Sequence, residues 1–189
     1  MSKHKLIGTI IGVALFAALI AGATFAFLSF TAEVINATYN GTSMNFLVDY
    51  TKGTDISTLP QLKTATPSTA AHLVINAKKH NNSVNGYLTI KLSTTSSNAL
   101  TSDGIVNWVL CKGACTSDFS AKKASGTITE GGSTSTPNVI TLWSDPELIS
   151  TSGTDYYIYF WIDANGINNN HVNNTFSGYI HASATQVSE

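Results

Sequence analysis

Asp-Tyr-Tyr-Ile-Tyr-Phe-Trp-Ile-Asp, residues 155–163, is the stretch of sequence that indicates the fold most directly. Its aromatic and β-branched residues favour extended backbone, and apolar side chains fall on both of its alternating faces. Such a strand is typical of the middle of a sheet that is covered on both sides. We therefore expect residues 155–163 to form a central strand of an all-β domain.

The same period of two recurs on both sides of this segment, interrupted by Gly, Asn, Ser and Pro. About eight strands with turns between them predict two sheets packed face to face, which is a jelly-roll-like β-sandwich. The last strand would turn Phe176, Gly178, Ile180, Ala182 and Ala184 inward. The expected strands cover residues 44–50, 73–77, 87–92, 105–110, 126–130, 139–143, 155–163 and 176–185.

Two segments depart from the alternating pattern. Residues 57–71 carry Pro60 and Pro67 among Thr and Ala, which indicates a long crossing loop. Residues 146–149 follow Asp145 and begin with a proline, which predicts a single helical turn capped by Asp145.

The polar residues of the chain are mostly uncharged. Ser, Thr and Asn together number 62, whereas only 21 of the 189 residues are charged and none is arginine. Nucleic-acid binding needs dense positive charge and relies on arginine to read bases, so this composition excludes nucleic acid as a partner. A surface with little charge allows copies of one chain to approach each other, which favours self-assembly.

The N-terminus has the form of an export signal. Lys3 and Lys5 precede an uncharged stretch at residues 6–32, and the small residues of Ala21-Gly22-Ala23-Thr24-Phe25-Ala26 suit cleavage between Ala26 and Phe27. We expect a secreted, extracellular or cell-surface protein in which residues 27–189 form one β-sandwich domain. The alternative is a permanent N-terminal membrane anchor, because the uncharged stretch is long enough to span a bilayer.

Cys111 and Cys115 are the only cysteines. In an oxidising compartment we expect a disulfide that closes a very short loop, with Gly113 supplying the tight bend. Free thiols and a metal site are the alternatives, and the metal site lacks neighbouring ligands at a recognisable spacing.

No catalytic motif is present, so we predict no enzymatic activity, no cofactor and no metal. His171, His181 and Asp163 could in principle meet at a metal, but a turn and the polar face of a strand explain the two histidines. The aromatic side chains around residue 160 could stack on sugars if exposed, although core packing is the more common use. Four Asn-x-Ser/Thr sequences are possible glycosylation sites, at Asn36, Asn40, Asn81 and Asn173.

Both ends of the chain resemble the TasA/camelysin family of secreted proteins. The similarity lies in Gly22-Ala23-Thr24-Phe25-Ala26 followed by Phe27, in Asn45-Phe46-Leu47-Val48, and in a last strand that ends with Ala184-Thr185-Gln186. The middle of the chain, including its cysteine loop, has no clear counterpart in the family. Asn173-Asn174 also replaces the usual Gln-Gly pair of the C-terminal turn.

The resemblance implies a jelly-roll subunit of a biofilm-matrix fibre or an archaeal bundling pilus. In such fibres the N-terminal segment freed by cleavage adds as a strand to the next subunit, by β-augmentation. Here that donor strand would be residues 27–39. Its apolar residues are Phe27, Leu28, Phe30, Ala32 and Val34.

We therefore expect a homopolymer that meets the membrane only through the N-terminal segment before cleavage. The first alternative is a membrane-anchored surface domain that presents its aromatic strands to glycans or host proteins. Some members of the family are known as metallopeptidases, but this chain has no metal-protease motif that could carry the activity. A secreted metallopeptidase is the last-ranked alternative.

Overall fold

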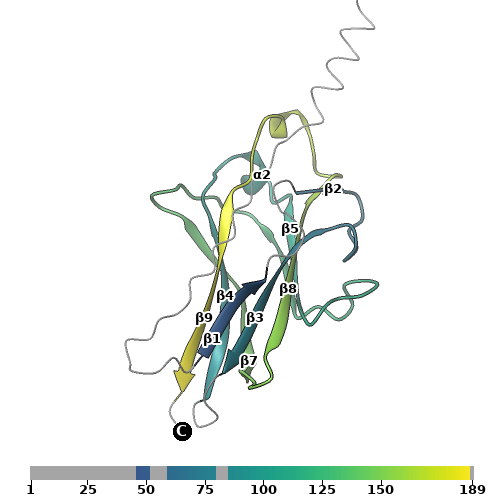
Figure 1. The fold of residues 1–189 in the computed structure, drawn as a ribbon. Helices are drawn as coiled ribbons and strands as arrows, with labels where there is room; N and C mark the ends of the chain where they lie inside the picture. The colour runs from purple at the N-terminus through teal and green to yellow at the C-terminus, as the bar shows by residue number, and fades with distance from the viewer. Residues whose placement is uncertain (1–45, 52–58, 80–84, 188–189) are drawn as a thin grey trace, which may run out of the picture.

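The computed structural model describes residues 46–51, 59–79 and 85–187, which form an all-β domain of two sheets (Figure 1). The predicted export segment, the donor strand and the sequons at Asn36, Asn40 and Asn81 lie outside these residues. In the part of the chain that is described, no helix has the length and hydrophobicity needed to cross a membrane.

The larger sheet is built around β8 (Thr154–Asp163), as the sequence predicts. β8 pairs antiparallel with β3 (Ala71–Lys79) on one side and with β5 (Val106–Lys112) on the other. The order is β1-β3-β8-β5-β6, and β2 pairs parallel with the end of β8. The remaining strands of this sheet are β1 (Phe46–Thr51), β2 (Gln61–Leu62) and β6 (Ala124–Ile128).

The smaller sheet has three strands in the order β7-β4-β9. Its centre is β4 (Asn85–Thr94), which pairs antiparallel with β9 (Gly178–Val187) over ten consecutive residue pairs. β7 (Asn138–Leu148) pairs with the other edge of β4, and its register shifts twice. The β4–β9 ladder is therefore the more regular half of this sheet.

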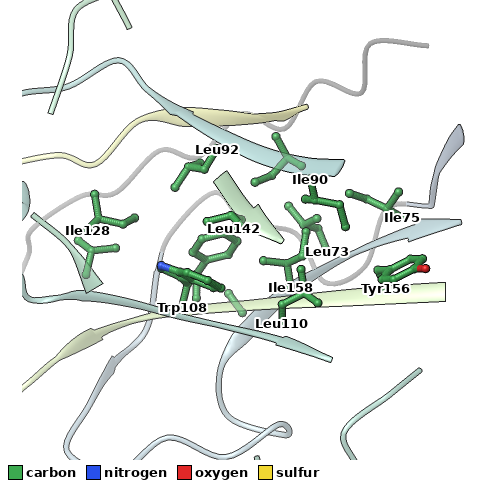
Figure 2. Close-up of a cluster of buried hydrophobic side chains, with 14 of the residues drawn as sticks. Leu73, Ile75, Ile90, Leu92, Trp108, Leu110, Ile128, Leu142, Tyr156 and Ile158 are labelled. Carbon is green, nitrogen blue, oxygen red and sulfur yellow. The ribbon is translucent and has the colours of Figure 1, made fainter. Parts of the chain in front are cut away.

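One hydrophobic core lies between the two sheets (Figure 2). Ile158 and Phe160 of β8 face Ile90 and Leu92 of β4, and all four side chains are fully buried. On β9, Ile180 and Ala182 are buried as well, together with Phe176 just before the strand. This confirms the predicted inner face of the last strand. Alternation at period two thus determines which side chains form the core.

The predicted strands correspond to β1 and β3–β9, and two predictions for other segments need correction. The prediction of a helical turn at residues 146–149 is wrong, because β7 continues through Pro146 to Leu148 and pairs with Tyr87 of β4. Proline fits there since β7 is an edge strand of its sheet, where a missing N–H is tolerated.

The predicted crossing loop at residues 57–71 is wrong in part, because β2 lies within it and extends the sheet beside β8. The sequence also gave no indication of two short helical segments, α2 (Ala99–Ser102) and the 3-10 turn η1 (Asn169–His171). Both are capped by asparagine side chains, Asn98 and Asn168, which accept hydrogen bonds from backbone N–H groups two residues later.

Leu92→Ala tests the location of the core. Leu92 is fully buried, so removing its side-chain volume should lower the free energy of unfolding by about 2–5 kcal/mol. Lys91→Ala is the matched control, because Lys91 is exposed on the opposite face of the same strand and its loss should change stability by less than about 0.5 kcal/mol. Urea denaturation measures both, and similar losses for the two variants would contradict this core.

Candidate functional site

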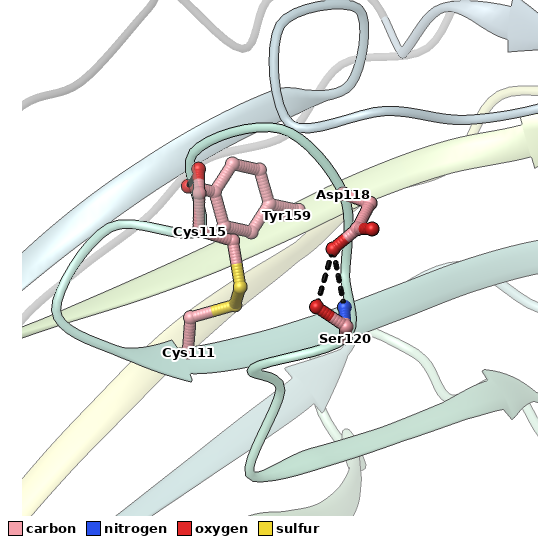
Figure 3. The surroundings of a disulfide bond; sticks show 5 residues. All are labelled: Cys111, Cys115, Asp118, Ser120 and Tyr159. Atoms are coloured by element: carbon pink, nitrogen blue, oxygen red, sulfur yellow. Dashed lines mark hydrogen bonds between the residues drawn. A yellow bond between two sulfur atoms is a disulfide. The ribbon is translucent and has the colours of Figure 1, made fainter.

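The Cys111–Cys115 loop lies at the end of β5, on the outer face of the larger sheet (Figure 3). The two cysteines are joined in a disulfide with an S–S distance of 2.00 Å, and both side chains are buried. Gly113 turns the chain with a φ of +76°, a conformation that favours glycine. Its N–H donates to the Asp155 carbonyl at 2.7 Å, so the loop is attached to the start of β8.

A turn after the disulfide places Phe119 over the outer face of β8. The carboxylate of Asp118 accepts hydrogen bonds from the hydroxyl and the N–H of Ser120, and these bonds lower the pKa of Asp118 (Figure 3). The ring of Phe119 stacks on Trp161 at 5.7 Å between centroids and meets Tyr159 edge-on at 5.2 Å. The loop is thus a cover for part of the sheet.

A row of rings continues beside this cover, and we call it the outer aromatic face: His72, Phe119, Tyr157, Tyr159 and Trp161. The His72 ring lies 5.9 Å from that of Tyr157 and 5.4 Å from that of Tyr159. Tyr159 is buried, whereas the other four side chains are partly exposed. Burial lowers the pKa of His72, which favours the neutral imidazole. The face is therefore uncharged, aromatic and partly open to solvent.

The aromatic residues around residue 160 divide between the two sides of the larger sheet. Tyr156 belongs to the main core, and Trp143 packs against that core from β7. Tyr157, Tyr159 and Trp161 point to the outer face. One side of Trp161 is occupied by Phe119, so a sugar ring would have only its other side for stacking.

A polar cluster that the sequence did not predict lies on the inner side of the same loop. The Lys112 ammonium is 2.9 Å from the buried carboxylate of Asp145 and 2.7 Å from the exposed carboxylate of Glu147. Asp145 also accepts hydrogen bonds from the Tyr156 hydroxyl and, at 3.0 Å, from the Glu147 N–H. The cluster connects β5 and β8 of one sheet with β7 of the other.

The charges in this cluster are stabilised by each other. Burial alone raises the pKa of Asp145, but hydrogen bonds from Tyr156, Glu147 and Lys112 hold it below its ordinary value. Burial works to lower the pKa of Lys112, and hydrogen bonds to Glu147 and Asp145 raise it above its ordinary value. Burial and then the bond to Asp145 raise the pKa of Tyr156. A protonated lysine lacks the lone pair of a nucleophile, so the cluster acts as an electrostatic tie.

The two histidines considered as metal ligands have separate roles. His171 Nδ1 accepts a hydrogen bond from the Asn168 N–H at 3.0 Å, and its Nε2 lies 3.1 Å from Asp103 without hydrogen-bond geometry. His181 contacts Ser93 Oγ at 2.9 Å on the outer face of the smaller sheet. Among the described residues there is no group of three His, Cys, Asp or Glu side chains that could hold a metal.

Asn173 is the one predicted glycosylation site within the described residues. It is exposed in the turn before β9 and has a φ of +65°, a conformation that asparagine tolerates better than most residues. The side chain is therefore accessible to a modifying enzyme.

Tyr156→Phe tests the tie between the sheets. The substitution keeps the ring in the core but removes a donor from a buried carboxylate, so we expect a loss of about 1–3 kcal/mol in the free energy of unfolding. Tyr157→Phe, one residue along on the outer face, should change stability by less than about 0.5 kcal/mol. Chemical denaturation at neutral pH compares them, and an equal effect of both would show that the Tyr156 hydroxyl has no special role.

The contribution of the disulfide can be measured with Cys111→Ala/Cys115→Ala. The bridge closes a loop with a sequence separation of four, and the entropy of such a short loop corresponds to about 2 kcal/mol. We expect the double variant to lose about that amount in urea denaturation. Reductant should lower the stability of the wild type to that of the double variant and leave the stability of the variant unchanged. If the fully reduced wild type were as stable to urea as the oxidised protein, the disulfide would not have this role.

The comparisons with known proteins do not assign this chain to a family. Nothing matched when the chain was compared with protein-family models, with curated proteins and with solved structures. The resemblance of both ends of the chain to the TasA/camelysin family therefore stays a prediction from the sequence.

Proposed function

We propose that this chain is a secreted structural subunit that polymerises into a pilus or matrix fibre. In the proposal, cleavage after Ala26 frees residues 27–39, which then add as a strand to the sandwich of the next copy. We also propose that the two sheets belong to a jelly roll, as the family resemblance implies, and that residues before the cut form an export helix. No enzymatic activity is part of this function.

The apolar start of the predicted mature chain carries the proposal. Residues 28–34 alternate Leu28, Phe30, Ala32 and Val34 with the polar residues Ser29, Thr31 and Glu33, which is the pattern of a strand with one buried face. Exposed apolar strands of this kind favour pairing with another sheet. The two-sheet β architecture supports the proposal, because backbone edges of a sheet are what a donated strand needs.

The composition of the domain agrees with repeated contact between identical copies. Its polar surface relies on Ser, Thr and Asn, so stacking many copies brings few like charges together. The disulfide and the Lys112–Asp145 contact secure the domain internally. A subunit that resists unfolding is suited to a fibre outside the cell.

Deleting residues 27–34 tests the proposal directly. The deletion removes the donated apolar residues and no described strand, so we expect a folded, monomeric domain. Electron microscopy and light scattering of the exported protein should show filaments for the wild type and none for the deletion. Circular dichroism controls for folding. Filaments formed by the folded deletion variant would rule out strand donation by this segment.

The outer aromatic face supports a second candidate function, which is binding of glycans or host proteins by a membrane-anchored surface domain. His72 and Tyr157 are partly exposed side by side, and Trp161 is partly exposed farther along β8. Such rings pack well against sugar faces. This function requires that the N-terminal segment is retained as an anchor.

Trp161→Ala distinguishes this second function on a glycan array. Binding that is lost in this variant, while its melting temperature shows a folded domain, would favour the surface-binding function. Tyr87→Ala is the control, because Tyr87 is an exposed aromatic residue on the other sheet and should leave glycan binding unchanged. No glycan binding by the wild type would reject the candidate.

A further inference from the structure

We propose that the edge of β9 that pairs with no described strand is the acceptor for the N-terminal strand of a second copy. This inference rests on the proposed function and specifies the surface on which it acts. β9 ends the β7-β4-β9 sheet, and no strand of the described residues pairs with its far edge. The three-stranded sheet is also the narrower of the two.

The edge of β9 has the features of a pairing surface. Its ten residues, Gly178–Val187, contain no Asp, Glu, Lys, Arg or Pro. Their register with β4 runs through all ten pairs without a bulge. Proteins that avoid edge pairing use charges, prolines, bulges or short edge strands, and β9 has none of these. A long, regular and uncharged edge offers a continuous row of backbone groups to an incoming strand.

The opposite edge of the same sheet is protected. β7 contains Pro146, which cannot donate a backbone hydrogen bond, and the acidic residues Asp145 and Glu147 flank it. The pairing of β7 with β4 is also shifted at two points. These features oppose the addition of a regular strand along the whole length of β7.

The edges of the larger sheet are less suitable as well. β6 has five residues and follows Lys122 and Lys123, so it is short and begins beside two positive charges. β1 has six residues and includes Asp49. Neither strand matches the ten residues of β9, whereas the proposed donor at residues 27–39 is long enough to pair along all of it.

The start of the described chain also points to this edge. Forty-five residues precede β1, which begins at Phe46, and β1 packs beside β9 at one side of the domain (Figure 1). The chain that leads to the donor strand therefore joins the domain near the edge of β9. Strand addition there would connect consecutive copies at one place, which produces a filament when it is repeated head to tail.

Photo-crosslinking between copies tests the assignment. Full-length chain with a benzophenone amino acid at Tyr179, on the outward side of β9, is exported, mixed with nitrogen-15-labelled chain, assembled and irradiated. The matched control carries the same group at Val139, an exposed position on β7 at the opposite edge. Mass spectrometry identifies the partner peptide and shows by its isotope content whether it comes from another copy.

We expect mixed-isotope crosslinks from position 179 to residues 27–39, and none to that segment from position 139. Filaments in which residues 27–39 crosslink from position 139, or in which position 179 yields only crosslinks within one copy, would overturn the assignment of β9 and leave the fibre function standing. Folded protein that forms no filaments would instead refute the fibre function itself, and the acceptor edge with it.

Discussion

The fold depends on the burial of both faces of β8. Inward, Tyr156, Ile158, Phe160 and Ile162 contribute to the core between the two sheets. Outward, Tyr157, Tyr159 and Trp161 present large rings that a bare sheet face would expose to water. The segment at residues 113–123 returns over this outer face, and Cys115 and Phe119 pack against it. A second, smaller apolar cluster thus follows from the composition of a single strand.

Two consecutive residues of β5 connect this cover to the rest of the domain. Side chains of neighbouring residues in a strand point to opposite faces. Cys111 points outward, where its disulfide closes the loop that precedes Phe119. Lys112 reaches Asp145 of the smaller sheet, next to Tyr156. The same strand end therefore fixes the outer cover and ties the two sheets together.

Alternation in the sequence predicted the β elements well because side-chain burial follows a period of two. The central place of residues 155–163 and the inner face of residues 176–184 could be derived in this way. The path of residues 145–148 could not, because an Asp-Pro pair suits both a helix start and an edge strand, and only pairing with β4 decides between them.

The polar cluster was beyond sequence analysis for a different reason. Lys112 and Asp145 are 33 residues apart, and no spacing rule links a lysine inside a cysteine loop to an acidic residue beside a proline. The two histidines are the opposite case. Histidine is a common metal ligand, so the sequence allowed a metal site, but in the structure His171 and His181 each make a separate contact. Contacts that depend on tertiary packing need coordinates, whereas local periodicity does not.

The central claim of the proposed function is that each copy donates a strand to the next. An electron cryomicroscopy reconstruction of the exported protein tests it most directly. The account predicts filaments in which residues 27–39 of one copy lie as a strand along β9 of the next. A monomeric particle, or a filament in which residues 27–39 remain within their own copy, would contradict it.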